Sequence, residues 1–246
     1  MLGYNKISMN RKIIFLTAVL AIAIFIVWFL MQNDPKNSNT TLKSSTAEIS
    51  YVAIGDSYTT GLGVLEKDRW QNVLTENLKK EDIDIELTVN PSVSGYTVRD
   101  AINYELPVVK QINPDFVTVF IGTNDNFARR DVALFEKDLK ELLDELQVEL
   151  PNPQNIVLIT IPDYSKSPAV AGYNSENISK SIENYNEVIK EEAEIRGLKI
   201  ADIFPVSQTM TDMNDYTADG LHPSAQGYLR WEKVIFPVVL DLLKKN

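Results

Sequence analysis

The sequence contains no cysteine and a single histidine, His222. The absence of cysteine excludes disulfide bonds, thiolate zinc sites, a cysteine nucleophile and a lipidated N-terminal cysteine. A single histidine also excludes a zinc site built on several imidazoles. Any reaction of this chain that needs an imidazole base must therefore use His222.

Basic residues are in the minority and are unevenly distributed. The chain has 24 Lys and Arg against 34 Asp and Glu, which gives a formal net charge of -10 at pH 7. Residues 1–31 hold three basic residues and no acidic residue, so the formal net charge changes from -10 to -13 when they are left out. Such an acidic surface should not bind nucleic acid through counterion release, and we expect no nucleic-acid partner.

Charge is absent from residues 13–31, IIFLTAVLAIAIFIVWFLM, which are long enough to cross the hydrocarbon core as a helix. Lys6, Arg11 and Lys12 precede this run, which predicts a cytoplasmic N-terminus and an exported remainder. The alternative is a secreted protein with a cleaved signal peptide, but WFLMQNDP lacks the small-x-small pattern of a cleavage site. We expect residues 1–31 to be a cytoplasmic stub with a single-pass anchor in the cell membrane.

The rest of the chain divides into a tether and one folded domain. Residues 32–47 are polar and rich in Asn, Ser and Thr, which is typical of a flexible linker. Apolar runs that predict strands lie at 48–55, 83–89, 116–122, 155–162 and 198–204. Segments with helical spacing lie at 68–80, 97–106, 131–150, 175–197 and 224–245. Residues 48–246 are therefore predicted to form a three-layer α/β/α sandwich around a five-stranded parallel sheet.

Small polar clusters follow each of the first three predicted strands, at residues 55–57, 94–95 and 122–125. Turn chemistry could explain each cluster separately, but ligands bind outside the carboxyl ends of parallel strands. Ser57 is then a candidate nucleophile, with His222 as its base. Asp219 lies three residues before His222, close enough in a compact turn to orient the imidazole. The same stretch also fits an Asp-Gly turn before a helix, and both interpretations can hold together.

Four motifs carry a family resemblance: AIGDSYTTGLG, NPSVSGYTVRD, GTND and DGLHP, in this order. Together they resemble the sequence blocks of the SGNH/GDSL hydrolases, a family of esterases and lipases. The sequence contains no G-x-S-x-G elbow of the α/β-hydrolases, which agrees. The resemblance covers about residues 50 to 245. It implies a flavodoxin-like α/β fold and no metal or organic cofactor, and together with the apolar run at residues 13–31 it predicts a membrane-anchored bacterial member of the family.

The resemblance also implies a role for five residues. Ser57, Asp219 and His222 would form the catalytic triad. The backbone N–H groups of Ser57 and Gly95 and the side-chain amide of Asn124 would form the oxyanion hole, and Gly95 would allow the substrate to approach closely because it lacks Cβ.

Other residues near these motifs have structural interpretations. We expect Asp56 and Asp125 to brace their loops by accepting hydrogen bonds from backbone N–H groups. Tyr58 replaces the leucine of the family pattern and should affect local packing or the pocket wall. The loop at residues 163–176 could shape the pocket or could be a solvated connection.

The expected function is that of an extracytoplasmic serine esterase acting on carboxylic esters. Its partner would be an ester substrate, either a lipid, as in lysophospholipases, or a short-acyl ester. An O-acetylesterase acting on cell-wall polysaccharide and an acyltransferase are alternatives within the same chemistry. A catalytically silent surface-binding module is a further alternative, which the complete set of motifs disfavours. The sequence leaves the natural substrate, the acyl-chain preference and the oligomeric state open.

Overall fold

The computed structural model describes residues 48–170 and 172–245. The predicted anchor at 1–31 and linker at 32–47 lie outside these residues. Within the described ranges, no helix combines the length and the apolar character that crossing a membrane requires.

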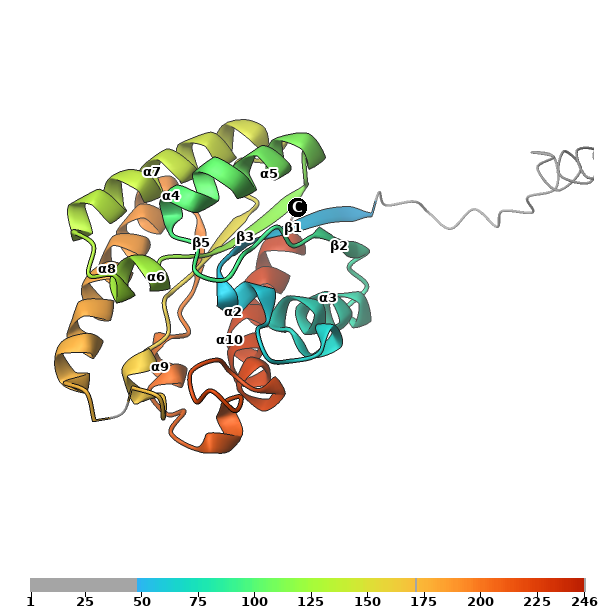
Figure 1. The fold of residues 1–246 in the computed structure, drawn as a ribbon. Helices are drawn as coiled ribbons and strands as arrows, with labels where there is room; N and C mark the ends of the chain where they lie inside the picture. Colours follow the sequence, from blue (N-terminus) through green and yellow to red (C-terminus); the bar gives the residue numbers. More distant parts are fainter. Residues whose placement is uncertain (1–47, 171, 246) are drawn as a thin grey trace, which may run out of the picture. The chain divides into compact units, whose positions relative to one another are not determined.

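The described chain is built around one parallel sheet (Figure 1). Its strands are β1 (Ile49–Gly55), β2 (Ile85–Val89), β3 (Phe116–Phe120), β4 (Ile156–Ile159) and β5 (Lys199–Ala201). They lie in the order β2-β1-β3-β4-β5, and every neighbouring pair is parallel. The predicted five-stranded parallel sheet is confirmed, and the strand order is that of the flavodoxin-like doubly wound sheets.

The central strands β1 and β3 are continuous apolar runs rather than alternations of apolar and polar residues. Every residue of β3, and residues 51–55 of β1, are buried, because helices cover both faces of the sheet. In the β1–β3 register, Tyr51 pairs with Phe116 and Gly55 with Phe120. The two strands therefore end at the same edge, and the polar clusters that follow them start side by side.

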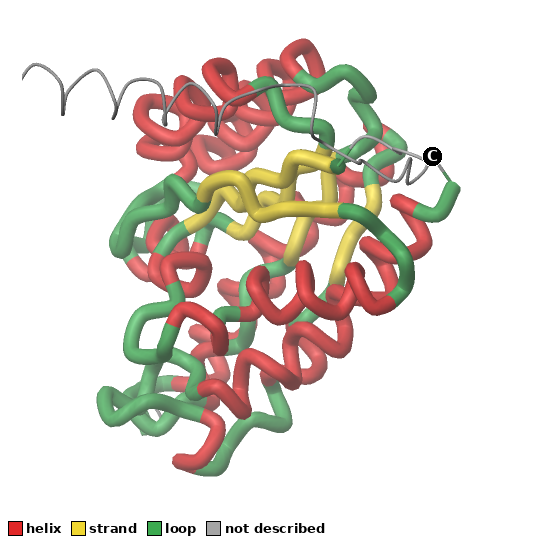
Figure 2. Tube along the Cα trace, turned by 90° about the vertical axis from the view of Figure 1, so that its right-hand side faces the viewer, coloured by secondary structure: helices red, strands yellow, loops and turns green. Residues whose placement is uncertain are grey.

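Helices pack on both faces of the sheet (Figure 2). The longer helices are α3 (Trp70–Lys80), α5 (Leu106–Ile112), α7 (Val132–Glu149), α8 (Ser175–Arg196) and α10 (Ala225–Leu243). The shorter helices are α2 (Ser57–Thr60), α4 (Val98–Asp100), α6 (Thr123–Phe127) and α9 (Phe204–Ser207). Short 3-10 turns are η1 (Glu66–Asp68), η3 (Tyr164–Lys166) and η4 (Met213–Asp215).

Two hydrophobic cores result, one on each side of the sheet. The core that contains Leu74 and Trp231 lies between the sheet and the helices α3 and α10. The core that contains Leu142 and Ile182 lies between the sheet and the helices α5, α7 and α8. The predicted three-layer arrangement is therefore present in the described part of the chain.

One predicted helix is longer than expected. The sequence predicted a short helix over 97–106, but α4 continues through a π-helical turn, η2 (Ala101–Glu105), directly into α5. The N–H of Leu106 bonds to the carbonyl of Ala101, five residues earlier, which widens the helix at this point. Pro107 is the second residue of α5, and because it has no N–H it cannot donate a hydrogen bond back to the preceding turn.

Candidate active site

The turn from β1 into α2 depends on Gly55 and Asp56. A Cβ atom on Gly55 would lie 2.2 Å from Thr59 Oγ1 and 2.6 Å from the carbonyl oxygen of Phe120, so only glycine lets α2 begin this close to β3. Asp56 is the N-cap of α2, and its Oδ1 accepts a hydrogen bond of 2.9 Å from the Tyr58 N–H. Ser57 is therefore the first helical residue at the carboxyl edge of the sheet. Asp56 thus accepts a backbone hydrogen bond within its own turn, as expected.

Hydrogen bonds connect Ser57, His222 and Asp219. His222 Nε2 lies 2.9 Å from Ser57 Oγ, although the two residues are 165 positions apart. On the other side of the ring, Nδ1 lies 2.6 Å from Asp219 Oδ2. In this geometry Nδ1 carries the hydrogen, because a carboxylate can only accept, and Nε2 is then free to accept from the serine hydroxyl. The arrangement can transfer a proton away from Ser57.

The turn that carries Asp219 fixes its carboxylate almost completely. Oδ1 accepts hydrogen bonds from the Leu221 N–H at 2.8 Å, the His222 N–H at 3.0 Å and the Thr217 hydroxyl at 2.8 Å. Burial alone would raise the pKa of Asp219, but the hydrogen bonds from Leu221, His222 and Thr217 outweigh burial and hold this pKa well below its usual range. Gly220, at φ +69°, makes the tight turn between Asp219 and His222 possible.

Gly95 lies in the loop after β2 and Asn124 in the short helix α6 after β3, and both line the same pocket as Ser57 and His222. Gly95 has φ +89°, and a Cβ atom built on it would point into open space. The positive φ of Gly95 therefore favours glycine at this position, and the space beside it is open. Asn124 Nδ2 donates a hydrogen bond of 2.9 Å to the carbonyl of Tyr96 and lies 3.4 Å from Asp56 Oδ2.

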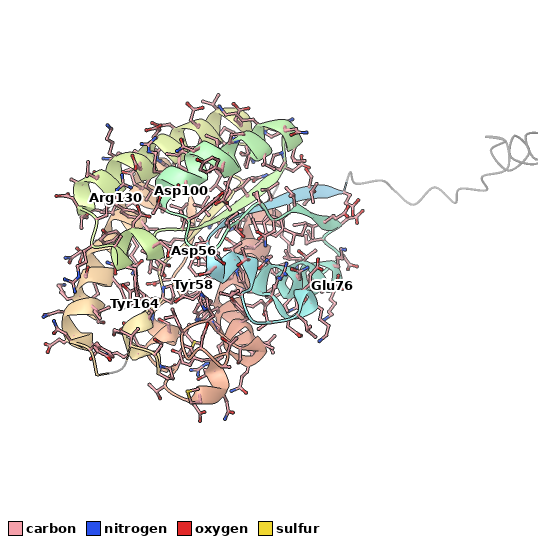
Figure 3. The ribbon with its side chains drawn as sticks, in the orientation of Figure 1. Asp56, Tyr58, Glu76, Asp100, Arg130 and Tyr164 are labelled. Atoms are coloured by element: carbon pink, nitrogen blue, oxygen red, sulfur yellow. The ribbon has the colours of Figure 1, made fainter. Side chains whose placement is uncertain are left out.

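The pocket has a volume of about 200 Å³, and its remaining walls are mostly apolar. They comprise Tyr58, Leu62, Phe127, Tyr164 and Leu221, together with the small polar residues Ser94 and Thr123. Figure 3 places Asp56, Tyr58 and Tyr164 around this end of the sheet. The walls can accommodate a short apolar group next to the Ser57 hydroxyl.

Tyr58 contributes to packing and to the pocket at the same time. Its ring is only 3% exposed and contacts Phe120 at 5.9 Å and Trp231 at 5.2 Å between ring centroids. The same ring lies 5.6 Å from the imidazole of His222. Tyr58 therefore contributes to local packing, where its ring contacts the imidazole of His222, and it also lines the pocket wall.

The loop at 163–176, whose role the sequence left open, supplies part of the pocket wall. Tyr164 lines the pocket, and its hydroxyl donates to Asn126 Oδ1 at 2.6 Å. Asp163, which is buried, accepts from the N–H and the hydroxyl of Ser165 and thereby holds this part of the loop. The N–H of Ala169 donates to the Gly220 carbonyl at 3.0 Å, so the loop also contacts the turn that carries Asp219.

The sequence patterns did not reveal Glu105, a completely buried residue whose carboxyl group contacts the Gly55 N–H at the end of β1. Burial raises the pKa of Glu105 to about 8, and it raises the pKa of Asp56 to about 7. A glutamate on an amphipathic helix is normally solvent-exposed, so no pattern in the sequence marked it. Within residues 48–170 and 172–245, no group of three or more His, Asp or Glu side chains is arranged to hold a metal ion.

Comparisons with known proteins identify the family of this chain. The family model described as "GDSL-like Lipase/Acylhydrolase family" matches residues 53–230. A multidomain esterase from Ruminococcus flavefaciens is 35% identical over 141 residues, which are 56% of this chain and 17% of that protein. An acetylxylan esterase from Geobacillus stearothermophilus is 30% identical over 159 residues, which are 57% of this chain and 66% of that protein. The chain thus matches less than two thirds of the length of each relative.

Solved structures of other proteins show the same fold. The psychrotrophic esterase EstA from Pseudoalteromonas sp., in a structure inhibited by monoethylphosphonate, superposes with a TM-score of 0.64. The match covers 80% of this chain and 99% of EstA at 19% sequence identity. At this identity the likeness shows the fold alone.

Proposed function

The chain belongs to the GDSL-like lipase/acylhydrolase family, and from that premise we propose that it is a carboxylic ester hydrolase with Ser57 as its nucleophile. The observation that carries the proposal is the chain of hydrogen bonds from Ser57 through His222 to Asp219, with distances of 2.9 and 2.6 Å. A serine hydroxyl is a weak nucleophile until a base removes its proton, and this arrangement supplies an oriented base.

The proposed reaction has two halves. Ser57 Oγ attacks the ester carbonyl carbon while His222 Nε2 takes the hydroxyl proton, and the negative charge moves to the carbonyl oxygen. The N–H groups of Ser57 and Gly95 and the amide of Asn124 donate to that oxygen. The C–O bond to the alcohol then breaks, and His222 returns its proton to the departing alkoxide. Water repeats the sequence on the acyl-enzyme, which releases the acid and restores Ser57.

Asp219 has two tasks in this scheme. Its Oδ2 holds the hydrogen on Nδ1, which leaves Nε2 free to act as base, and its charge stabilises the imidazolium that forms. The three hydrogen bonds to Oδ1 keep the carboxylate ionised and fixed while the imidazole changes charge. Tyr58, packed against the ring, limits its movement.

We propose that the acyl group of the substrate is short. The pocket of about 200 Å³ is walled by Leu62, Phe127 and Tyr164, which favours a small apolar group over a long chain. A lipid substrate with a short or exposed acyl chain is compatible with these walls, and Leu62 and Phe127 are 45% and 60% exposed at the surface.

An O-acetylesterase acting on polysaccharide is the second candidate. It is favoured by the similarity to a relative named acetylxylan esterase. An acetyl group is the smallest acyl group that the pocket would receive, so both candidates share one mechanism and differ in the alcohol.

We also propose that the hydrolase domain is held outside the cytoplasm at the cell membrane. The proposal rests on the uncharged run at residues 13–31 and on the basic residues before it. Such a location would bring the pocket to lipid or cell-wall esters.

The test combines a substrate series with a labelled nucleophile. Purified protein is assayed with p-nitrophenyl esters of two to twelve carbons and with acetylated xylan, from which acetate release is measured. A phosphonate ester should label Ser57, and Ser57→Ala should lose both labelling and hydrolysis while its melting temperature stays unchanged. Transfer of the acyl group to an added alcohol in preference to water would identify an acyltransferase. Labelling of a different residue, or full activity of Ser57→Ala, would contradict the proposal.

A further inference from the structure

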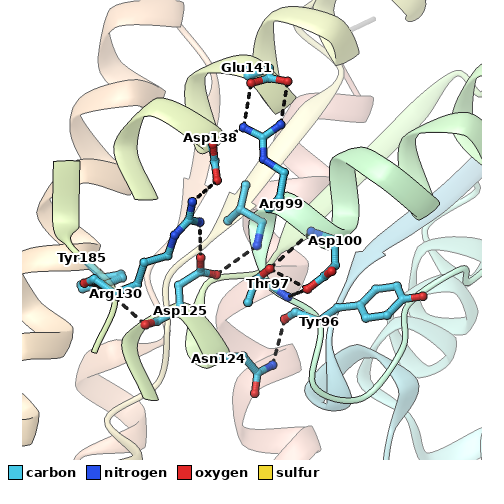
Figure 4. Close-up of polar contacts among 11 residues, drawn as sticks. Tyr96, Thr97, Arg99, Asp100, Asn124, Asp125, Arg130, Asp138, Glu141 and Tyr185 are labelled. Carbon is cyan, nitrogen blue, oxygen red and sulfur yellow. Dashed lines mark hydrogen bonds and ion pairs between the residues drawn. The ribbon is translucent and has the colours of Figure 1, made fainter. Parts of the chain in front are cut away.

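Two connections, the β2–α4 loop that carries Gly95 and the β3–α7 connection that carries Asn124 on α6, are joined by a pair of neighbouring hydrogen bonds (Figure 4). Asn124 donates from Nδ2 to the Tyr96 carbonyl at 2.9 Å, and Asp125 Oδ2 accepts from the Val98 N–H at 3.0 Å. Consecutive residues at the start of α6 therefore bind the backbone on both sides of position 97. These two bonds therefore join the start of α6 to the chain that directly follows Gly95.

Asp125 is itself held by a series of ion pairs. It is completely buried, and Arg130 donates to its Oδ1 at 2.8 Å. The same guanidinium binds Asp138 on α7, and Asp138 also binds Arg99 on α4. Arg99 also forms a bidentate ion pair with Glu141, in which Nη1 donates to Oε1 at 2.9 Å and Nη2 donates to Oε2 at 2.8 Å. We call these side chains the ion-pair network; its members are Asp125, Arg130, Asp138, Arg99 and Glu141.

The network closes a ring through the backbone. Arg99 follows Val98 directly, and Val98 is the residue whose N–H binds Asp125. Asp138 thus connects α4 with the α6–α7 loop, and Figure 4 shows the two arginine side chains converging on this carboxylate. Asp138 is only 3% exposed, so water screens these contacts weakly. A closed ring of this kind resists a relative shift of the two loops.

None of these side chains lines the pocket that contains Ser57. We propose that Asp125, Arg130 and Asp138 are positioning residues, which hold the Gly95 N–H and the Asn124 amide at the separation that the oxyanion requires. The inference rests on the proposed function of these two donors. Preorganised donors stabilise an oxyanion only when they are already in place, and a displacement of about 1 Å can lower a rate by about 10²-fold.

The test variant is Arg130→Lys. Lysine keeps the positive charge but lacks the planar fork, so it can bind Asp125 or Asp138 but not both in the present geometry. Arg196→Lys is the matched control, because Arg196 is also largely buried and joins Glu192 on α8 to Asp144 on α7. The control interrupts a comparable ion pair that has no contact with either loop.

Two measurements are made on both variants. The first is hydrogen exchange at the Val98 amide, which reports the bond to Asp125 whether or not the protein hydrolyses esters. We expect exchange at this amide to rise at least about tenfold in Arg130→Lys and to stay unchanged in Arg196→Lys. The second is steady-state kinetics, where Arg130→Lys should lower kcat by about tenfold or more with KM changed less than about threefold.

A double-mutant cycle separates positioning from general destabilisation. If Arg130 acts through Asn124, the kcat loss caused by Arg130→Lys should shrink to less than about threefold in an Asn124→Ala background. Equal losses in both backgrounds, or a loss that Arg196→Lys reproduces, would overturn the proposal. Unchanged exchange at Val98 would also overturn it. If the wild-type protein hydrolysed no ester, the proposed function would fail, and exchange at Val98 would still decide whether the network holds the loops together.

Discussion

The Gly55 N–H donates a hydrogen bond of 2.9 Å to Glu105 Oε2, so a buried carboxyl group holds the end of β1 just before the nucleophile. Glu105 reaches this position from the π-helical turn η2. Its other oxygen, Oε1, has no hydrogen-bond partner among the described residues. An ionised carboxylate in such a place would be strongly destabilised, so the neutral acid is the stable form at neutral pH. The raised pKa of about 8 agrees.

This relationship predicts how stability depends on pH. The pKa of Glu105 is raised from 4.5 to about 8 by burial, so the folded state keeps a proton that the unfolded state loses above about pH 4.5. The stability that this proton contributes is fully present below pH 4.5 and is lost as the pH rises towards 8. Burial also raises the pKa of Asp56, from 3.8 to about 7. Asp56 therefore makes stability fall with rising pH in the same direction and over an overlapping pH range.

Glu105→Gln should therefore make folding stability depend less on pH, without removing the hydrogen bond from the Gly55 N–H. The amide oxygen still accepts from the Gly55 N–H, and the neutral side chain cannot ionise. We expect the melting temperature of the wild type to fall between pH 5 and 8, and that of Glu105→Gln to fall less steeply, because Glu105 no longer contributes to the slope while Asp56 still does. Thermal unfolding at intervals across this range measures both slopes. Parallel slopes in the two proteins would show that Glu105 is ionised in the folded state.

Much of the site was predictable from sequence, because its residues lie in short motifs at predicted strand ends. Ser57, Gly95 and Asn124 follow three successive strands, and the parallel topology brings those ends together. Asp219 and His222 were predictable because both lie in one compact turn. A local pattern was sufficient in each case.

The supporting residues could not be found in this way. Glu105 is buried through a π-helical turn that no periodicity reveals, and Arg99 and Asp138 are 39 positions apart in the sequence. Charged side chains are expected at the surface, so pattern reasoning assigns them to solvated helix faces. Only the packing of α4 against α7 brings the two together. Pro107 predicts the end of the helix at 97–106, whereas α5 continues to Ile112.

The next prediction concerns the oxyanion donor Asn124. Asn124→Ala should lower kcat by about 10²–10³, with a smaller change in KM, because the donor acts on charge that develops in the transition state. Asn186→Ala is the matched control: its amide is buried and bonds the Ile161 backbone outside the pocket. The control should lose thermal stability and keep its kcat. A loss under about threefold in Asn124→Ala would mean that this amide only holds the Tyr96 carbonyl.

A further prediction concerns location. Residues 13–31 carry no charge and follow three basic residues, so the domain after them should be exposed at the outer face of the membrane. We expect protease added to intact protoplasts to digest the domain, and the protein to remain with membranes after a high-salt wash. A mature protein in the medium that begins near Gln32 would instead show that the segment is a cleaved signal peptide.

The last prediction concerns Asp219→Asn, for which the hydrogen bonds determine the outcome. Three donors, from Thr217, Leu221 and His222, converge on Oδ1, so the amide oxygen of asparagine must take that position. Its NH2 group then faces His222 Nδ1, where Oδ2 now lies at 2.6 Å. The NH2 group can only donate, so Nδ1 must become the acceptor and the ring hydrogen must move to Nε2.

In that tautomer Nε2 can no longer accept the proton of Ser57, although every atom stays close to its present place. We therefore expect kcat to fall by about 10⁴ with little change in KM or in melting temperature. Phosphonate labelling of Ser57 should slow in parallel, because it needs the same base. Asp212→Asn is the matched control, since Asp212 caps a nearby 3-10 turn through the Asn214 N–H and contacts neither Ser57 nor His222. Its kcat should equal that of the wild type. NMR of the ring nitrogens of His222, the only imidazole in the chain, reports the tautomer directly, and a hydrogen still on Nδ1 in Asp219→Asn would contradict this account.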